Sequence, residues 1–164
     1  MTEVLRLESV DGWRKVGTIP VGGLTAVGFS ETEHFLLVLS HDGRGVLETQ
    51  TGSRVARSRE TPRYDSPWLN ESARLIEGVP PVEGEWIEGV GLWGGSLPRC
   101  NQSGWSVRLE SLGTVEYGYA RQGSSPQEFL IDSAVTEIRA FGFSKSGRFL
   151  VFASSSELSL HEHT

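Results

Sequence analysis

Short apolar runs separated by polar turn residues fill the first third of the chain. The runs alternate apolar and polar positions or are continuously apolar over four to six residues, which is typical of β-strands. Their spacing of roughly ten residues favours an antiparallel meander over alternating strands and helices. The sequence predicts extended segments at residues 4–10, 13–19, 24–30, 34–40, 44–50 and 53–58.

Dipeptides that end in glycine mark the turns between these segments. Asp11-Gly12 joins two extended runs, and Asp42-Gly43 and Thr51-Gly52 repeat the arrangement. A two-residue type I′ turn needs positive φ at both central positions, which Asp-Gly supplies readily. We therefore expect β-hairpins at these places.

The middle of the chain has a different composition. Residues 61–81 contain four of the seven prolines, and we interpret residues 59–85 as an irregular insertion. Residues 68–78 are the one stretch where a helical turn or two is expected, with Asn70 or Ser72 as the cap. Strand patterns then resume at 85–92, 105–111, 115–120, 128–133, 137–144, 148–155 and 158–163. The whole chain is thus predicted to be a single all-β domain.

An internal repeat supports this fold class. Residues 26–40 match residues 140–154 at seven of fifteen positions. In both copies a strand ending in Phe-Ser enters a polar turn and leaves as a continuous apolar run. Such a run is typical of a strand covered on both faces, in the interior of a packed sheet.

The two copies, extended to residues 26–50 and 140–162, resemble blade repeats of the WD40-like β-propellers. The resemblance rests on GFSETEHFLLVLSHDG and GFSKSGRFLVFASS, in which a Phe-Ser turn joins two inner strands. It implies four-stranded antiparallel sheets and a non-catalytic scaffold for partners. Neither copy carries the family's Gly-His or Trp-Asp dipeptide, and the copies lie 114 residues apart, outside a 40–45-residue period. We therefore expect two blade-like sheets packed as a sandwich or partial propeller.

Composition and charge restrict the function. The chain of 164 residues has a net charge of −6, which disfavours nucleic acid and anionic membranes and favours a basic protein partner. It shows neither a signal-peptide pattern nor an apolar run of membrane-spanning length, so we expect a cytoplasmic protein. Arginine outnumbers lysine by 13 to 2, as a GC-rich bacterial genome produces. The single Cys100 leaves no internal disulfide and reads as a lone thiol.

The spacing Gly89-x-Gly91-x-x-Gly94 matches a dinucleotide-binding fingerprint. That fingerprint works only where the glycines lead into a helix whose amino terminus faces the pyrophosphate. Here Pro98 and Gly104 follow within a polar stretch that cannot continue as a helix. We interpret the glycines as a kink in a strand and expect no cofactor.

Two further clusters invite a catalytic or metal-binding interpretation. Ser40-His41-Asp42 contains the three residue types of a Ser-His-Asp catalytic triad. Consecutive strand residues point to opposite faces and cannot converge, so we expect the end of a strand entering a turn. His161-Glu162-His163 could chelate a metal with His34 or His41, although a frayed, solvated terminus is the interpretation we favour. No metal is therefore expected.

Charged and aromatic residues concentrate around the insertion. Residues 53–64 carry four arginines against one glutamate, and residues 76–98 carry four glutamates and no basic residue, so the two segments either neutralise each other or form a bipolar binding patch. Trp86 and Trp105 are expected in the core, and Tyr64 and Trp68 at the surface. The predicted partner-binding residues are Arg57, Arg59, Arg63, Tyr64, Asp65, Trp68, Glu83, Glu85 and Trp93.

These features favour a non-enzymatic protein-binding module. Its most concrete form is an immunity-type or regulatory inhibitor that covers a basic toxin or effector, which needs shape and negative potential but no catalytic group. The alternative is a small carbohydrate-binding or hydrolytic β-protein that uses Glu83 or Glu85 with the Trp86 and Trp93 rings. An oligomer formed through an uncovered sheet edge is a third reading.

Overall fold

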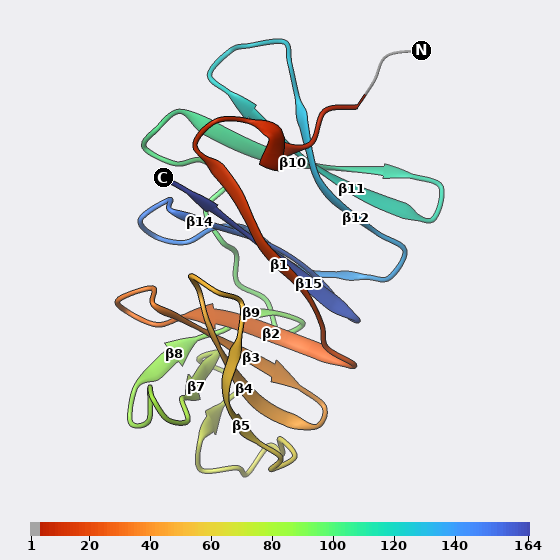
Figure 1. The fold of residues 1–164 in the computed structure, drawn as a ribbon. Helices are drawn as coiled ribbons and strands as arrows, with labels where there is room; N and C mark the ends of the chain where they lie inside the picture. The colour runs from red at the N-terminus through yellow and green to blue at the C-terminus, as the bar shows by residue number, and fades with distance from the viewer. Residues whose placement is uncertain (1–3) are drawn as a thin grey trace.

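The computed structural model describes residues 4–164 and shows an all-β protein (Figure 1). One 3₁₀ turn, η1 (Leu7–Ser9), precedes the strands, and the described part of the chain contains no α-helix. The strands are β1 (Trp13–Pro20), β2 (Leu24–Phe29), β3 (Phe35–Ser40), β4 (Gly43–Glu48), β5 (Arg54–Ser58), β6 (Leu69–Asn70), β7 (Leu75–Glu77), β8 (Trp86–Glu88), β9 (Val90–Gly91), β10 (Trp105–Leu112), β11 (Val115–Gln122), β12 (Phe129–Ala134), β13 (Ile138–Phe143), β14 (Phe149–Ser154) and β15 (Glu157–His163).

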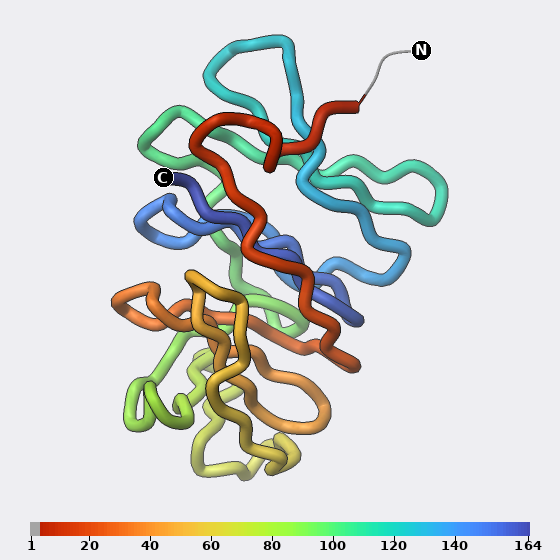
Figure 2. The backbone as a smooth tube through the Cα atoms, in the orientation of Figure 1, coloured from red at the N-terminus to blue at the C-terminus, as the bar shows by residue number. Residues whose placement is uncertain are grey.

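The strands form four antiparallel sheets, none closed into a barrel; three lie one above another, and the strands β7 and β8 of the fourth lie next to the lowest of these (Figure 1). Sheet 1 has the order β10-β11-β12 and sheet 2 the order β1-β15-β14-β13. Sheet 3 has the order β5-β4-β3-β2-β9 and sheet 4 the order β6-β7-β8. Sheet 2 joins the two ends of the chain, because β1 runs antiparallel to β15 (Figure 2).

Three apolar layers fill the spaces between successive sheets. The alternation of side chains along β14 shows how one strand serves two layers: Val151 packs toward sheet 3 and Phe152 toward sheet 1. In β3, Val38 faces sheet 2 and Leu39 faces sheet 4. The expectation that both continuous apolar runs are covered on both faces is confirmed, and each central sheet is a two-sided core.

The two copies of the repeat form the paired strands β2–β3 and β13–β14, and these pair in the same register. Gly28 lies opposite Leu37 and Gly142 opposite Val151, at equivalent positions of the two copies. In each copy the serine of the Phe-Ser pair closes the turn. The Phe35 amide donates to Ser30 Oγ at 3.2 Å, and the Phe149 amide donates to Ser144 Oγ at 3.1 Å. The Phe-Ser signature is therefore a turn device.

Both repeat glycines permit another segment to run close beside the strand. A Cβ on Gly28 would lie 2.4 Å from the Glu88 carbonyl oxygen, and one on Gly142 would lie 2.5 Å from the Pro98 carbonyl oxygen. No side chain fits at such a distance, so glycine is required there. The glycine of the first copy thus allows the backbone at the end of β8 to pass close to β2, just before β9 pairs with β2 at the edge of sheet 3.

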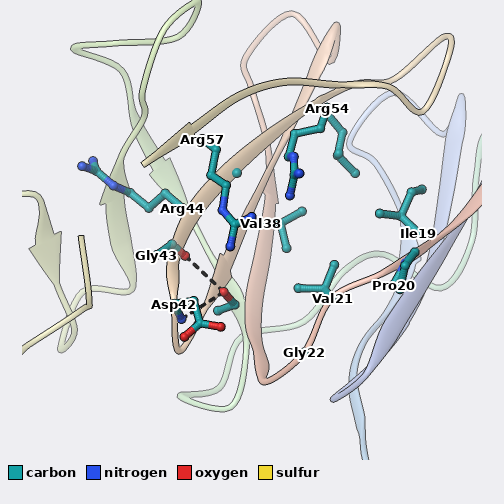
Figure 3. Close-up of a pocket in the computed structure, with 13 residues that line it drawn as sticks. Ile19, Pro20, Val21, Gly22, Val38, Asp42, Gly43, Arg44, Arg54 and Arg57 are labelled. Atoms are coloured by element: carbon teal, nitrogen blue, oxygen red, sulfur yellow. Dashed lines mark hydrogen bonds between the residues drawn. The ribbon is translucent and has the colours of Figure 1, made fainter. Parts of the chain in front are cut away.

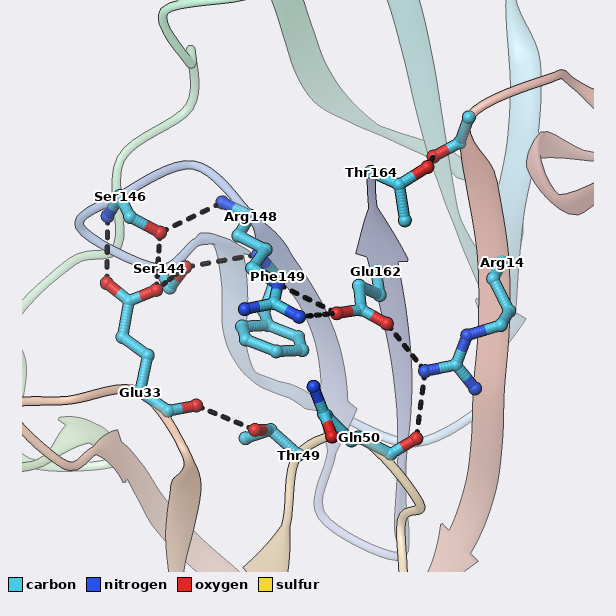
Figure 4. Close-up of polar contacts among 11 residues, drawn as sticks. Arg14, Glu33, Thr49, Gln50, Ser144, Ser146, Arg148, Phe149, Glu162 and Thr164 are labelled. Carbon is cyan, nitrogen blue, oxygen red and sulfur yellow. Dashed lines mark hydrogen bonds and ion pairs between the residues drawn. The ribbon is translucent and has the colours of Figure 1, made fainter.

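Polar contacts tie the turns of sheets 2 and 3 together (Figure 4). The Glu33 carboxylate accepts hydrogen bonds from Ser144 Oγ and from the Ser146 amide, both at 2.8 Å. Within sheet 2, the buried Glu162 accepts from Arg14 Nη2 at 2.6 Å and from Arg148 Nε at 2.7 Å. Burial alone raises the pKa of Glu162, but these hydrogen bonds outweigh it and the net pKa is lowered.

Two local expectations are wrong. Asp11-Gly12 does not join two strands, because residues before it form η1, whose Leu7 is buried in the core. Residues 68–78 form no helix but the short hairpin β6–β7, in which Asn70 Oδ1 caps the turn by accepting from the Ala73 amide at 3.1 Å. The hairpins expected at Asp42-Gly43 and Thr51-Gly52 are confirmed between β3, β4 and β5.

Candidate functional site

The exposed indole of Trp86 is the centre of the candidate site. In β8 the side chains alternate, so that Ile87 packs into the layer between sheets 3 and 4 while Trp86 and Glu88 point outward. Trp86 is 45% exposed, and the expectation that it belongs to the core is therefore wrong. The sequence Trp-Ile-Glu indicates this exposure, because side chains alternate along a strand and only one face of an outer sheet is covered.

A shallow aromatic groove of about 860 Å³ lies on one side of Trp86. Tyr64, 90% exposed, lines it from a turn in which the Arg63 amide donates to Ser66 Oγ at 3.0 Å. The half-buried Trp93 lines it from the segment that follows β9. The complete lining is Tyr64, Ser66, Pro67, Leu69, Asn70, Glu71, Ser72, Trp86 and Trp93.

An acidic pocket of about 470 Å³ lies on the other side of the same indole. It is lined by Phe29, Ser30, Glu31, Glu33, Glu85, Trp86, Ile87, Glu88 and Lys145, so four carboxylates face a single ammonium group. Trp86 belongs to both linings. We call Trp86, the aromatic groove and the acidic pocket together the Trp86 surface.

Backbone contacts hold part of the acidic pocket in place. Glu85 Oε1 accepts a hydrogen bond from the Glu31 amide at 2.7 Å, which joins the loop after β2 to the start of β8. Glu88 is paired with Arg74 at 3.0 Å but remains 62% exposed, and the Glu31 side chain makes no ion pair within residues 4–164. Carboxylates with remaining acceptor capacity therefore face solvent beside Trp86.

Trp68 is not a surface residue, contrary to the sequence expectation. It is 5% exposed and packs with the apolar residues between sheets 3 and 4. The guanidinium of Arg44 lies over its ring at 4.0 Å and donates from Nη1 to the Glu77 carbonyl oxygen at 2.6 Å. The insertion thus contributes a large ring to the core, and a partner-binding role for Trp68 is excluded by its burial.

The other predicted partner-binding residues separate into three groups. Arg63, Tyr64 and Asp65 lie on the exposed turn at the rim of the aromatic groove, and Trp93 lines that groove. Glu85 lines the acidic pocket, and exposed Glu83 lies beside it in sequence at a bridge to Gly78. Arg57 lines a different pocket between sheets 2 and 3, and Arg59 is exposed just after β5.

The glycine-rich stretch is a kink, as the sequence predicts. Gly91 pairs with Ala26 in sheet 3, where a Cβ would lie 2.1 Å from the Thr25 carbonyl oxygen. Gly94 has a φ of 104° in the turn that follows. These glycines serve a close backbone approach and a turn, and no helix follows them for a pyrophosphate to face.

The carboxy-terminal histidines differ from the expectation of a frayed end. β15 lies inside sheet 2 between β1 and β14, and His161 is fully buried with Nε2 3.3 Å from Glu8 Oε2. Burial lowers the pKa of His161, and the contact with Glu8 opposes this. His163 stacks on Trp13 with ring centroids 4.7 Å apart. Both histidines are structural.

Ser40 and Cys100 lie where the sequence predicts. Ser40 ends β3, and its Oγ accepts from the Asp42 amide at 3.2 Å, which is a turn contact. Cys100 is exposed and unpaired among the described cysteines. No group of three or more His, Cys, Asp or Glu side chains able to hold a metal occurs in the described range 4–164.

Comparison with known proteins gives no family assignment. No protein-family model matches the chain, and no curated protein has a significantly similar sequence. Among the residues that the structure describes, no helix is long and apolar enough to cross a membrane.

Proposed function

We propose that this chain is a non-enzymatic protein-binding module that receives a basic segment of a partner protein on the Trp86 surface, in the manner of an immunity-type or regulatory inhibitor. The observation that carries the proposal is the position of Trp86, 45% exposed between an aromatic groove and a pocket of four carboxylates. An exposed indole flanked in this way offers both an aromatic face and carboxylates to a cation.

The physical basis is the combination of a large ring with carboxylates of opposite charge to the ligand. Tryptophan is the best aromatic partner for a Lys or Arg side chain, and it leads the residue types that dominate contact energies at interfaces. A cation laid on Trp86 can reach Glu31 or Glu88, while apolar side chains enter the groove toward Tyr64 and Trp93. The net charge of −6 adds long-range attraction for a basic partner.

The test compares three sets of peptides with matched length and apolar content that carry basic, acidic or neutral side chains. Binding to the intact chain is measured by calorimetry at low and at moderate salt. We expect the basic set to bind, with affinity that falls as salt rises because exposed ion pairs are screened. Trp86→Ala should weaken this binding about tenfold or more, as removal of an interface tryptophan does.

Leu112→Ala provides the matched control. Leu112 is an exposed apolar residue, 57% accessible, at the distant turn between β10 and β11. Its truncation removes exposed apolar area without touching the Trp86 surface. Selection of the acidic peptides, equal weakening by the two substitutions, or unchanged binding by Trp86→Ala would each contradict the proposal.

A saccharide is the second candidate for the same groove. Tyr64, Trp86 and Trp93 offer aromatic faces, and Asn70 and Ser72 add polar groups to the lining. Ring faces with a few polar groups are also suited to a small polar ligand with apolar patches. Oligosaccharides in the same calorimetric series distinguish the two candidates, because their binding would depend on Trp86 but would be indifferent to salt.

A further inference from the structure

A second pocket, which shares no lining residue with the Trp86 surface, lies between sheets 2 and 3 (Figure 3). Its volume is about 250 Å³, which is the liquid volume of roughly eight water molecules. One wall is apolar and comes from the end of β1 and the following turn: Ile19, Pro20 and Val21. The floor comes from β3 and β4, where Val38 and Leu47 belong to the core layer.

Two guanidinium groups form the opposite wall. Arg54 and Arg57 extend from β5 toward this space, whereas Arg44 is directed away toward Trp68 (Figure 3). Within residues 4–164, neither Arg54 nor Arg57 makes a side-chain hydrogen bond or an ion pair. Asp42 is the single carboxylate of the lining.

A β-bulge places both arginines on the same face. Residues three apart on a regular strand point to opposite faces. Here the register shifts, so that Arg54 pairs with Leu47 and Arg57 with Gly45, two residues that share a face of β4. The extra residue, Val55, is left 46% exposed. Bulges of this kind commonly redirect side chains at binding sites.

Gly45 keeps the space between the arginines open. It lies directly opposite Arg57, and a Cβ built on it would meet Arg54 Cδ at an ordinary 3.7 Å and the Ala56 carbonyl oxygen at 4.0 Å. A side chain could therefore be accommodated there and would occupy the pocket. Its absence leaves two like charges beside an apolar cleft, an arrangement that an anion stabilises.

We infer that this pocket binds a small oxyanion, a carboxylate or a phosphate, that carries a short apolar group. The fork-shaped donors of Arg54 and Arg57 match an oxyanion, and the Ile19, Pro20 and Val21 wall receives the apolar part. Asp42 lowers the positive charge of the site and limits the anionic charge that it accepts. The inference does not depend on the proposed function, since the two sites share no residue.

The experiment is an NMR titration of the intact chain that follows the side-chain Nε–Hε signals of arginine. The probes are inorganic phosphate, isobutyl phosphate, 3-methylbutanoate and the uncharged isobutanol. We expect the Arg54 and Arg57 signals to shift with the two amphipathic anions. The phosphate and carboxylate arms show which oxyanion binds more tightly, inorganic phosphate should bind more weakly, and isobutanol should cause no shift.

Four substitutions separate the pocket from general attraction to positive charge. Arg54→Gln and Arg57→Gln should each weaken binding of the preferred anion about tenfold, because each removes charge-assisted hydrogen bonds. Gly45→Leu should abolish binding with all charges retained, and Asp42→Asn should strengthen it. Arg59→Gln, which removes an exposed arginine outside the lining, is the matched control.

Three outcomes would overturn the inference. The first is the absence of a shift at Arg54 and Arg57 with every probe. The second is weakening by Arg59→Gln as large as that by Arg57→Gln, which would show attraction to surface charge alone. The third is an unchanged dissociation constant in Gly45→Leu, confirmed as folded by its amide spectrum, since binding would then lie outside the cleft.

Discussion

At the scale of single residues, two tryptophans of the same segment have opposite environments. Trp68 packs between sheets 3 and 4 under the Arg44 guanidinium, and Trp86 points outward from β8. Their surroundings in the sequence are similar, with proline and acidic residues nearby. Trp68 lies in the turn before β6 and packs into the apolar layer, whereas Trp86 lies on the outward face of β8, and this decides whether each ring stabilises the fold or is available to a partner.

Trp68→Ala should strongly destabilise the protein. It removes a buried ring and leaves the 7%-exposed Arg44 over a cavity, so we expect a loss of about 3–5 kcal/mol in the free energy of unfolding. Urea denaturation followed by circular dichroism measures it. Trp86→Ala, in contrast, should change stability by about 0.5 kcal/mol or less. Comparable losses in the two variants would mean that Trp86 also has a structural role.

The sequence predicted part of the site at this scale. Tyr64 was expected at the surface and is exposed, and Trp105 was expected in the core and is buried. The errors at Trp68 and Trp86 have one cause: tryptophan combines a large apolar area with a polar nitrogen and is common both in cores and at interfaces. The alternation Trp-Ile-Glu in β8 places Trp86 on the same face as the charged Glu88 and so indicates that Trp86 is exposed.

At the scale of elements, the repeat explains why certain residues recur. Each copy contributes a hairpin with a serine-closed turn and a glycine beside which another segment passes. Apolar runs predicted the central strands β3 and β14 well, because burial on both faces leaves little alternative for such runs. β8 lies within the predicted segment 85–92, whereas the β5 bulge and the strands β6 and β7 were not predictable, since they depend on register with other strands.

Gly28→Ala should disturb the path of β8 and β9. The added methyl group would lie 2.4 Å from the Glu88 carbonyl oxygen and 2.6 Å from Ile87 Cγ2, so the segment must move. We expect a loss of about 1–3 kcal/mol in the free energy of unfolding, together with weaker binding at the Trp86 surface.

Gly22→Ala is the matched control for this prediction. Gly22 lies on the turn between β1 and β2, outside the left-handed φ region, and a Cβ there would meet no atom within 4 Å. Its substitution should therefore leave stability unchanged or slightly raised. A Gly28→Ala protein as stable as the Gly22→Ala protein would show that β8 can move away from residue 28 at no cost. The close approach of β8 would then not explain why glycine occurs at this position.

At the scale of the whole molecule, β1 pairs with β15 as the edge strand of sheet 2, so that the last strand of the chain lies inside the sheet. A pattern of polar residues such as His-Glu-His gives no indication of this, because the strand that covers it on one side, β1, precedes it by more than a hundred residues. Two buried polar side chains of β15 have partners from the same distance: Arg14 contacts Glu162, and Glu8 contacts His161.

This long-range pairing makes the stability of the protein depend on pH. Burial lowers the pKa of His161, against the opposing contact with Glu8, and burial also lowers the pKa of His163. The unfolded chain therefore binds protons on these histidines more readily than the folded chain does. Stability should be constant above about pH 6.5, where both states are neutral, and should fall as the pH decreases below it, by at most about 1.4 kcal/mol per pH unit and histidine.

The lowered pKa of Glu162 acts in a separate window. Its contribution is present above the usual carboxylate value and is lost only as the pH falls below about 4.5. Lys15 and Asp132 also face His161, the former lowering and the latter raising its pKa. The decline between about pH 6.5 and pH 5 thus belongs to the buried His161 and the half-buried His163.

Urea denaturation at a series of pH values measures this decline. His161→Gln retains a side-chain donor near Glu8 but does not titrate, so its stability should fall less steeply below about pH 6.5 than that of the parent chain. His34→Gln, at an exposed position, should retain the parent slope. An unchanged slope in His161→Gln would mean that His161 binds protons equally in the folded and unfolded states, and it would assign the pH dependence to His163, whose ring lies on Trp13. Titration of both imidazole Cε1 signals by NMR tests this assignment.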